Sequence, residues 1–376
     1  MSKVKVGVIF GGRSVEHEVS LVSARAVMNH LDASRYEIVP IGISREGRWL
    51  TADNATLMLE QGVTEGKAMI PVALPADPSV KGLVPMGSTA DGQKQVPLDV
   101  IFPLVHGTGG EDGTLQGLLE MTGLPYVGSG VLGSSLGMDK IAMKAAFNAG
   151  GIPCAEFIAV TRQRATSDAA GVGREIAQKF GFPCFTKPAN GGSSVGVTKV
   201  KGPADLARGL AEAAQYDRRI LIEEAIDGQE VECAVLGNEA PEASVVGEII
   251  PCNEFYDYSA KYLEDGSELI IPARISAQQG ERVRALSLDA FRALDAAGMA
   301  RVDFFVRRRD GEVLINEINT IPGFTPISMY PRLWAASGVG FAELVDRLIQ
   351  LALSRHAETR ASRTDYAPGQ KLPGGR

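Results

Sequence analysis

The fold class is decided by the first apolar stretch of the chain, Val4-Lys5-Val6-Gly7-Val8-Ile9-Phe10-Gly11-Gly12. A nearly continuous apolar run that ends at a glycine pair is typical of a buried strand followed by a tight turn. A polar segment follows at 13–20, and apolar residues then recur at helical spacing from Leu21 to Leu31. The sequence therefore predicts a strand, a polar loop and a helix, which is the repeating unit of an α/β fold.

Further strands extend this pattern outward from the first one. The segments 36–43 and 99–105 are again apolar and strand-like, and a helix is expected after the second of them. Strands that alternate with helices predict a parallel sheet, and ligands bind at the carboxyl ends of such strands. The polar loops 13–20 and 106–113 both lie at these ends. The intervening segment 45–97 is rich in turn residues and is expected to form small hairpins.

Composition limits the classes of protein to which the chain can belong. Its 376 residues carry a formal net charge of −7 and are 45% hydrophobic, which suits two or three globular domains. The mild acidity without a basic run argues against nucleic-acid binding. The chain lacks the ~20 consecutive apolar residues of a membrane span, and its four cysteines match no zinc or disulfide spacing. We therefore expect a cytoplasmic enzyme without membrane insertion.

The order of the predicted elements divides the chain into four parts. We expect an N-terminal α/β domain at 1–137, a central subdomain at 138–225 and a C-terminal subdomain at 226–355. The remaining segment, 356–376, contains few apolar residues towards its end and is expected to be a disordered tail.

A predicted hairpin near the C-terminus carries the first set of candidate site residues. The segments 300–306 and 312–319 both alternate as strands, and Arg309-Asp310-Gly311 between them is typical of a turn. A two-residue loop would place the polar residues of the two strands on opposite faces. A three-residue loop, with Gly311 in the left-handed conformation, would place them on one face.

The three-residue loop is the alternative that we favour, and it has a chemical consequence. It pairs Asp303 with Glu317 and Arg301 with Asn319. Two carboxylates, an amide oxygen and water form the oxygen-rich set that Mg²⁺ prefers beside substrate phosphates. The competing interpretation is a solvated polar face of a sheet. The sequence thus predicts a magnesium site on this hairpin.

A glycine-rich loop supplies a second candidate site. In Phe185-Thr186-Lys187-Pro188-Ala189-Asn190-Gly191-Gly192-Ser193-Ser194-Val195-Gly196-Val197, a strand delivers a lysine and is followed by three glycines and two serines. Backbone N–H groups of such a loop can approach phosphate oxygens, and the lysine adds positive charge. The motif G-x-x-x-x-G-K-[ST] is absent. A flexible surface loop is the alternative interpretation of this segment by itself.

A third glycine-rich segment suggests a different class of enzyme. Gly128-Ser129-Gly130-Val131-Leu132-Gly133 matches the dinucleotide-binding pattern G-x-G-x-x-G, and Glu156 lies near the spacing of a ribose-binding acid. The apolar run before it is short and contains Pro125, so we interpret the segment as a glycine-rich linker. A nicotinamide-dependent oxidoreductase is therefore the weaker alternative.

Five blocks of the sequence, taken together, resemble the D-alanine–D-alanine ligase family of ATP-grasp enzymes. The blocks are 10–20 (FGGRSVEHEVS), 106–117 (HGTGGEDGTLQG), 187–196 (KPANGGSSVG), 255–262 (FYDYSAKY) and 316–325 (NEINTIPGFT). They occur in the order found in the family and span most of the chain. The resemblance implies a three-domain ATP-grasp architecture with an N-terminal Rossmann-like domain.

The resemblance also implies the activity, the cofactors and the assembly. Members of the family join two D-alanines with ATP, through an acyl phosphate, and release ADP and phosphate in the synthesis of peptidoglycan precursors. Two Mg²⁺ ions assist, and Mn²⁺ can replace them. A homodimer is expected. The alternative is an ATP-grasp ligase that joins D-alanine to another acceptor, such as D-lactate.

Roles for individual residues follow from the same resemblance. The metal ligands are expected to be Asp303, Glu317 and Asn319. The residues implied in ATP binding are Lys140, Lys187, Gly192, Ser193, Glu223, Glu224, Ala225, Ile226, Glu230 and Lys261. The residues implied in catalysis are Glu16, Ser193, Tyr262, Arg301 and Gly323.

The substrate-binding residues implied by the resemblance are Glu16, His106, Tyr262, Arg301, Gly323, Ser328 and Met329. Glu16 is expected to hold the ammonium group of the first D-alanine, and Arg301 to stabilise the oxyanion of the tetrahedral intermediate. Branches of the family that form depsipeptides tend to replace the tyrosine at position 262, so Tyr262 favours a dipeptide product. Glu16 alone could equally be a charge at a helix N-terminus, and His106 a structural histidine.

Overall fold

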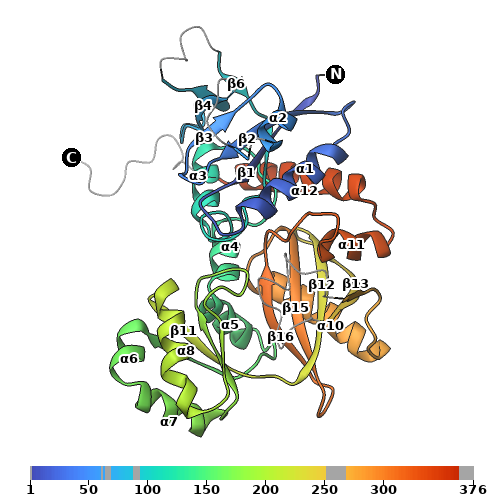
Figure 1. The fold of residues 1–376 in the computed structure, drawn as a ribbon. Coiled ribbons are helices and arrows are strands. Elements are labelled where there is room, and N and C mark those ends of the chain that lie inside the picture. The colour runs from blue at the N-terminus through green and yellow to red at the C-terminus, as the bar shows by residue number, and fades with distance from the viewer. Residues whose placement is uncertain (1, 61, 64–68, 88–93, 251–267, 364–376) are drawn as a thin grey trace, which may run out of the picture.

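The chain folds around three β-sheets, one for each of three consecutive stretches of sequence (Figure 1). The computed structural model describes residues 2–60, 62–63, 69–87, 94–250 and 268–363. Within these residues, no helix is both long enough and apolar enough to cross a membrane.

The first sheet confirms the prediction from the N-terminal apolar run. Strands β1 (Val4–Gly11), β2 (Tyr36–Ile43) and β7 (Val100–Pro103) pair in parallel, with β1 in the centre. Beyond β2 the sheet continues with short antiparallel strands, which are the predicted hairpins of 45–97. These strands are β3 (Trp49–Thr51), β4 (Ile70–Ala73), β5 (Gly82–Pro85) and β6 (Val96–Pro97). The sheet is therefore mixed rather than wholly parallel.

Helices follow the parallel strands, as the sequence predicts. Helix α1 (His17–His30) follows β1, and α3 (Thr114–Thr122) follows β7 and ends at Gly123, which has a left-handed φ of 64°. The remaining helices before the second sheet are α2 (Ala55–Glu60), α4 (Val131–Met138) and α5 (Lys140–Ala149). Because β1 and β7 are adjacent and parallel, the loops after them lie at the same edge of the sheet.

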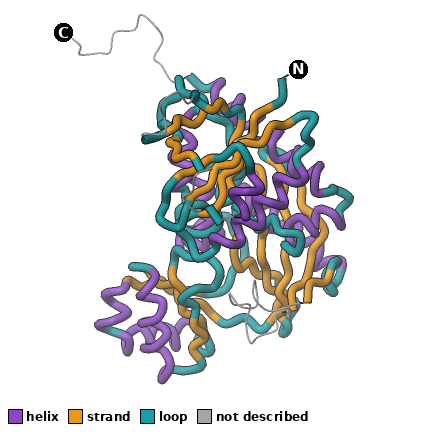
Figure 2. Tube along the Cα trace, turned by 45° about the horizontal axis from the view of Figure 1, so that its top comes forward, coloured by secondary structure: helices purple, strands orange, loops and turns teal. Residues whose placement is uncertain are grey.

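The second sheet is antiparallel, with strand order β10-β9-β11-β8. Its strands are β8 (Phe157–Thr161), β9 (Cys184–Pro188), β10 (Thr198–Val200) and β11 (Arg219–Glu224). Its helices are α6 (Arg162–Ser167), α7 (Ala169–Lys179) and α8 (Pro203–Tyr216). Apolar residues of these helices and strands share one core, so this part forms a separate lobe (Figure 2).

The third sheet is also antiparallel, with strand order β14-β13-β12-β15-β16. Its strands are β12 (Gly228–Gly237), β13 (Glu242–Ile250), β14 (Glu268–Ile270), β15 (Gly298–Arg307) and β16 (Val313–Asn319). Helix α10 (Ala277–Ala293) packs on one face of this sheet and shares a core with it.

The predicted pairing of β15 with β16 is confirmed, although the turn that produces it differs from the prediction. Asp303 lies opposite Glu317, and Arg301 lies opposite Asn319. The turn has four residues, 308–311, since the N–H of Arg307 donates to the carbonyl of Glu312 (2.9 Å).

A bulge in the hairpin explains why Asp303 still pairs with Glu317 although the turn is one residue longer than predicted. The register shifts by one residue between Asp303 and Phe304, which leaves Asn316 unmatched on β16. This extra residue compensates for the longer turn and returns Asp303 and Glu317 to the predicted pairing. Gly311 has the expected left-handed conformation (φ 74°).

The last helices connect the third sheet to the first. Helices α11 (Met329–Ala336) and α12 (Phe341–Ala361) contribute to a core that also contains residues of β1, β7, β12 and β15. The predicted tail is wrong for residues 356–361, because α12 continues through them with Leu344, Leu348 and Ile349 anchoring its earlier turns in this core. Residues 364–376 lie outside the described part of the chain.

The glycine-rich segment at 128–133 is more ordered than a linker. Residue Tyr126 forms a parallel bridge with Ile101, and α4 begins at Val131. A Cβ atom on Gly298 would lie 3.0 Å from the backbone nitrogen of Gly128, so the segment packs closely against the start of β15. The glycines at this point allow two backbones to meet.

Candidate active site

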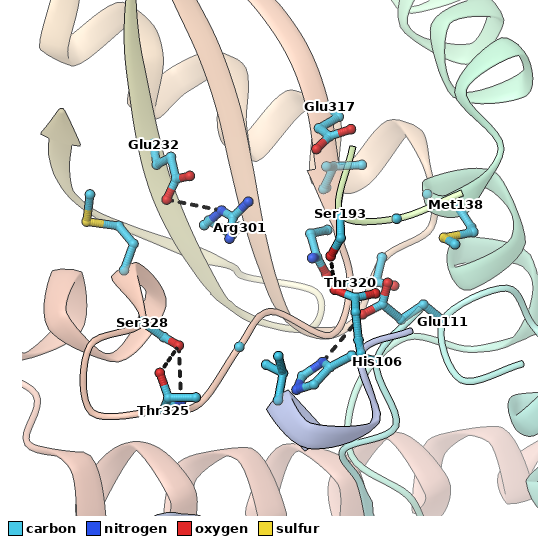
Figure 3. A pocket seen from close by; sticks show the side chains of 18 of the residues that line it. His106, Glu111, Met138, Ser193, Glu232, Arg301, Glu317, Thr320, Thr325 and Ser328 are labelled. Carbon is cyan, nitrogen blue, oxygen red and sulfur yellow. Dashed lines mark hydrogen bonds and ion pairs between the residues drawn. The ribbon is translucent and has the colours of Figure 1, made fainter. Parts of the chain in front are cut away.

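Two adjacent cavities lie where the three sheets meet, and they separate the predicted residues into two groups. The first cavity, of about 440 Å³, is lined by all described residues predicted to bind the amino acids: Glu16, His106, Arg301, Gly323, Ser328 and Met329 (Figure 3). The second, of about 690 Å³, is lined by all described residues predicted to bind ATP: Lys140, Lys187, Gly192, Ser193, Glu223, Glu224, Ala225, Ile226 and Glu230.

The two cavities have a common wall. Residues that line both are Lys140, Gly191, Gly192, Ser193, Glu232, Ile249 and Glu317. A group bound at the inner end of one cavity would therefore lie close to a group bound in the other. This arrangement suits the transfer of a chemical group between two ligands.

The buried carboxylate of Glu16 links the first domain to the glycine-rich loop. The Ser193 hydroxyl donates a hydrogen bond to Glu16 Oε1. Cβ atoms added to Gly107 or Gly192 would lie 2.6 Å and 2.8 Å from Glu16 Oε2, so only glycine allows the two loops to approach this carboxylate. Ser193 itself has a left-handed backbone (φ 48°), which is uncommon for a residue with a side chain. The sequence alone did not indicate this strain.

The position of Glu16 follows from the edge of the first sheet. The Gly11 N–H donates to Ser20 Oγ (2.8 Å), and Ser20 Oγ donates to the Leu104 carbonyl (2.5 Å). Ser20 therefore joins the ends of β1 and β7, rather than capping the helix. Glu16 precedes the first residue of α1, and its side chain is directed into the cavity instead of accepting a helix N–H.

His106 is held in a buried network in the same cavity. Its ring nitrogens contact the Ile321 carbonyl (3.0 Å) and the Ser23 hydroxyl (3.0 Å), and its Nδ1 lies 3.5 Å from Glu111 (Figure 3). Burial lowers the pKa of His106, but the carboxylates of Glu111 and Glu16 outweigh it and raise the pKa above its usual value. Burial raises the pKa of Glu111. The predicted substrate histidine is thus also a structural one.

Arg301 on β15 lines the first cavity, and its partners Asp303 and Glu232 both line the second. Its guanidinium donates two hydrogen bonds to Asp303, at 2.7 Å and 2.6 Å, and its Nε lies 3.1 Å from Glu232 on the neighbouring strand β12. Burial lowers the pKa of Arg301, but Asp303 and Glu232 outweigh it and keep the group charged. The two carboxylates fix the orientation of the guanidinium plane.

The predicted metal ligands form a set that fits Mg²⁺. Asp303 and Glu317 are a cross-strand pair, and both line the second cavity. Asn319 lines the first, and its Oδ1 accepts the Ile321 N–H (2.9 Å). Among the described residues, no group of three or more His, Cys, Asp or Glu side chains could hold a metal ion. The predicted set therefore depends on the amide oxygen of Asn319, and on water, besides its two carboxylates. These are hard oxygen donors.

Lys140 connects the metal-ligand candidates to the glycine-rich loop. Its ammonium group donates to the Gly191 carbonyl (2.9 Å) and lies 3.2 Å from Glu317. Its backbone N–H donates to Ala189 (2.8 Å). Lys140 begins α5, and the preceding Asp139 caps this helix and forms an ion pair with Arg219 of β11. The lysine is therefore rigidly placed at the common wall.

Lys187 and Glu223 form a buried cluster at the floor of the second cavity. The Lys187 ammonium lies 2.6 Å from Glu223, and Lys144 of α5 forms a second ion pair with the same carboxylate. Burial opposes ionisation of Glu223, but Lys144 and Lys187 outweigh it and lower its pKa to about 2. Burial also opposes the charge of Lys187, yet Glu223 raises the pKa of this lysine.

The predicted hinge residues form the rim of the second cavity. The Glu224 N–H donates to Glu156 (2.9 Å) and the Ala225 N–H donates to Pro183 (3.3 Å). Ile226 lies between β11 and β12, and Glu230 lies on β12 opposite Phe305 of β15. These residues bring strand backbone and an apolar ring to one side of the cavity.

The loop after β16 closes the far end of the first cavity. The hydroxyl groups of Thr325 and Ser328 are 2.7 Å apart, and the Thr325 N–H donates to Ser328 Oγ (3.1 Å) (Figure 3). A Cβ atom on Gly323 would lie 2.8 Å from Ser328 Oγ. Ser328 precedes α11, whose first residue is Met329, so the helix N-terminus faces the cavity.

Some predicted residues are outside the described structure, and some residues of the site were not predicted. Lys261 and Tyr262 lie in 251–267, outside the described residues. The sequence analysis missed Lys144, Glu111 and Glu232. Lys144 follows Lys140 by one helical turn, which was a usable signal, whereas Glu232 enters only through the pairing of β12 with β15.

Comparison with solved structures defines the class. The VanG D-Ala:D-Ser ligase from Enterococcus faecalis has a TM-score of 0.84 and 36% identity, over 93% of this chain and 100% of that chain. The D-alanine–D-alanine ligase from Coxiella burnetii has a TM-score of 0.82 and 37% identity, over 96% of this chain and 97% of that one. The protein is thus an α/β enzyme of the ATP-grasp class.

Sequence comparisons define the family. Models for the N-terminus and the C-terminus of D-ala D-ala ligase match residues 5–129 and 146–350. The D-alanine–D-alanine ligase of Geobacillus thermodenitrificans is 50% identical over 95% of this chain and 97% of its own length, and that of Ruminiclostridium cellulolyticum is 47% identical over 97% and 99%. The chain belongs to the D-alanine–D-alanine ligase family, which uses ATP.

Proposed function

We propose that this protein joins two D-alanines into D-alanyl-D-alanine with ATP, for the synthesis of peptidoglycan precursors. The observation that carries the proposal is the common wall of the two cavities, where Lys140, Ser193 and Glu317 border both a candidate amino-acid site and a candidate nucleotide site. Identity of 50% to a curated D-alanine–D-alanine ligase over 95% of the chain supports it.

The reaction has two steps. A carboxylate oxygen of the first D-alanine attacks the γ-phosphorus of ATP, the bond to the β,γ-bridging oxygen breaks, and ADP leaves an acyl phosphate behind. The amine of the second D-alanine then attacks the acyl carbon, loses a proton and expels phosphate. Anionic reactants must meet in the first step, so positive charge is needed at the common wall.

The residues of the first cavity would orient the amino acids. Glu16 would hold the ammonium group of the first D-alanine by charge-assisted hydrogen bonds. Arg301, fixed by Asp303 and Glu232, would stabilise the developing oxyanion. Gly323 and the start of α11 at Ser328 and Met329 would receive the carboxylate of the second D-alanine, because a helix N-terminus attracts anions.

The residues of the second cavity would bind the nucleotide. Lys140 and Lys187 would neutralise phosphate oxygens, and the loop with Gly192 and Ser193 would cover them. Asp303, Glu317 and Asn319 would hold two Mg²⁺ ions, or Mn²⁺, which supply charge neutralisation for phosphoryl transfer.

The resemblance to the D-alanine–D-alanine ligase family supports the remaining parts of the proposal. Glu223, Glu224, Ala225, Ile226 and Glu230 would contact the adenine and ribose, Lys261 the γ-phosphate, and Tyr262 the first D-alanine. The three sheets would belong to the domains 1–137, 138–225 and 226–355. We further propose a homodimer located in the cytoplasm.

The test is an assay of ADP release with four candidate substrates. We expect release with Mg²⁺ and D-alanine, and much less when L-alanine replaces it. D-serine or D-lactate added to D-alanine should yield little mixed product by mass spectrometry. Predominant formation of a D-Ala-D-Ser or D-Ala-D-lactate product would reject D-alanine as the second substrate. Absence of ADP release would reject the proposal.

A further inference from the structure

Helix α5 carries a buried lysine outside the lining of both cavities. Lys144 is 1% exposed and lies one helical turn after Lys140. It forms an ion pair with Glu223 but lines neither cavity, whereas Glu223 and Lys187 both line the second. Glu223 is therefore between a lysine that a ligand can reach and a lysine that it cannot.

The position of α5 explains this arrangement. The helix lies between the second and the third sheet (Figure 1). Its residues Met143 and Phe147 belong to the apolar core of the third sheet, whereas the side chain of Lys144 reaches Glu223 on β11 of the second. Lys144 thus reaches Glu223 from α5, whereas Lys187 reaches it from β9.

Nucleotide binding would change the ion pairs of Glu223, and Lys144 affects the cost of this change. A lysine that turns from Glu223 to a phosphate leaves the carboxylate without that partner. An unpaired charge in a buried position is costly. Glu223 is only 2% exposed while both lysines are paired with it, so most of its stabilisation comes from these cations rather than from water. A second cation beside the carboxylate removes most of this cost.

We propose that Lys144 is a positioning residue that keeps Glu223 paired while Lys187 moves to the phosphates of the nucleotide. The inference rests on the proposed function, because it takes Lys187 as a phosphate ligand. Lys144 does not touch the nucleotide. It lowers the free energy needed to separate Lys187 from Glu223.

The charge balance of the cluster supports this assignment. Two lysines share the carboxylate of Glu223, so these three described side chains carry one net positive charge, which Glu317 and Glu230 also attract. With Lys144 removed, Lys187 and Glu223 would form a balanced pair that resists the approach of Lys187 to an anion. With Lys144 present, the excess charge is available to a polyphosphate.

The first experiment measures ATP and ADP binding by isothermal titration calorimetry for the full chain and for Lys144→Met, which has a similar length without charge. We expect nucleotide affinity to fall at least about tenfold, since a tenfold change is a small part of the cost of an unpaired buried charge. The KM for D-alanine at saturating ATP should stay within about twofold. Unchanged nucleotide affinity would overturn the proposal.

Two matched variants separate charge from packing. Lys144→Arg retains the charge and should recover most of the affinity. Lys179→Met removes a lysine of the same lobe that pairs with Glu156 outside both cavities, and it should leave affinity unchanged. A loss of equal size in Lys144→Arg and Lys144→Met would overturn the electrostatic role, as would an equal loss in Lys179→Met.

The second experiment tests whether Lys144 acts through Glu223, and it remains decisive if Lys144→Met alone does not fold. Glu223→Gln and the double variant Glu223→Gln/Lys144→Met are compared. Without a carboxylate to neutralise, Lys144 should not matter, so both should have the same nucleotide affinity. A further tenfold loss in the double variant would overturn the proposal.

A reference variant distinguishes this inference from the proposed function. Lys187→Ala should lose nucleotide affinity if Lys187 binds phosphate. Affinity retained in Lys187→Ala would reject the phosphate role and this inference together, while ADP release by the unaltered protein would still support the ligase activity. Affinity lost in Lys187→Ala but unchanged in Lys144→Met would reject only the role of Lys144.

Discussion

Two clusters of charged side chains border the second cavity, and they differ in burial and in the sign of their excess charge. Around Glu223, two lysines share one carboxylate that is 2% exposed. On the third sheet, the carboxylates of Glu232, Asp303 and Glu317 share the cations Arg301 and Lys140, and these carboxylate side chains are 5%, 14% and 25% exposed in turn. Counted over the described side chains alone, the first cluster has surplus positive charge and the second has surplus negative charge.

This difference explains how one cavity can serve both a polyphosphate and a metal. A surplus cation favours phosphate oxygens, whereas a surplus carboxylate favours Mg²⁺. The different exposure of the Glu223 and Glu317 carboxylates fits these two ligands. The lysines around Glu223 are already charged and paired, so they can be buried. Ligands of Mg²⁺ must remain accessible, because this ion usually keeps several of its waters.

The largest effect is expected from the acidic cluster. Glu317→Gln removes a proposed metal ligand at the common wall and should lower kcat by about 1,000-fold or more, because phosphoryl transfer depends on charge neutralisation. The measurement is ADP release at saturating D-alanine and ATP. Glu312→Gln, at the exposed end of the same hairpin, is the matched control and should be fully active. Activity retained in Glu317→Gln would contradict the metal assignment.

The lysine cluster should control stability in acid. The folded pKa of Glu223, about 2, is below its ordinary value of 4.5, so its contribution to stability is complete above pH 4.5 and is lost as pH falls towards 2. A shift of this size corresponds to about 3 kcal/mol. Urea unfolding between pH 6 and pH 3 should show a shallower loss of stability in Glu223→Gln than in the unaltered protein. Identical slopes would refute the coupling.

Asp303 should affect metal affinity more than the chemical step. Asp303→Asn removes a negative charge while Glu232 still holds Arg301, so the Mg²⁺ concentration for half-maximal activity should rise on the order of 30-fold, within the range seen when metal sites are altered. The measurement is a Mg²⁺ titration of ADP release. The contrast with Glu317→Gln would be weakened if saturating Mg²⁺ did not restore most of kcat.

The smallest effect is expected at the hydrogen bond between Ser193 and Glu16. A hydrogen bond to a charged group contributes about 1.5 kcal/mol at the low end, so Ser193→Ala should raise the KM for the first D-alanine about tenfold. The KM for ATP should change less, because the backbone of the glycine-rich loop is retained. An equal rise of both KM values would show that Ser193 serves the two cavities alike.

The sequence predicted much of the fold because its signals were local. The apolar run of β1, the helical spacing in α1 and the glycine after α3 each act within a few residues. The hairpin of β15 and β16 was harder. The predicted pairing of Asp303 with Glu317 is confirmed, but a four-residue turn and a bulge at Asn316 produce it, because tertiary packing selects among turns that are close in energy.

For the candidate site too, some features were predicted from the sequence and others were decided by the tertiary structure. By itself, the sequence determined the residue types, the strand ends at which they lie and the resemblance that grouped them, since these depend on order along the chain. Only the tertiary structure decided that Lys144 shares a carboxylate with Lys187, that Glu232 holds Arg301 and that Glu16 is enclosed by Gly107 and Gly192. Such contacts join elements distant in sequence, and their energies depend on burial and charge, which exist only once the chain has folded.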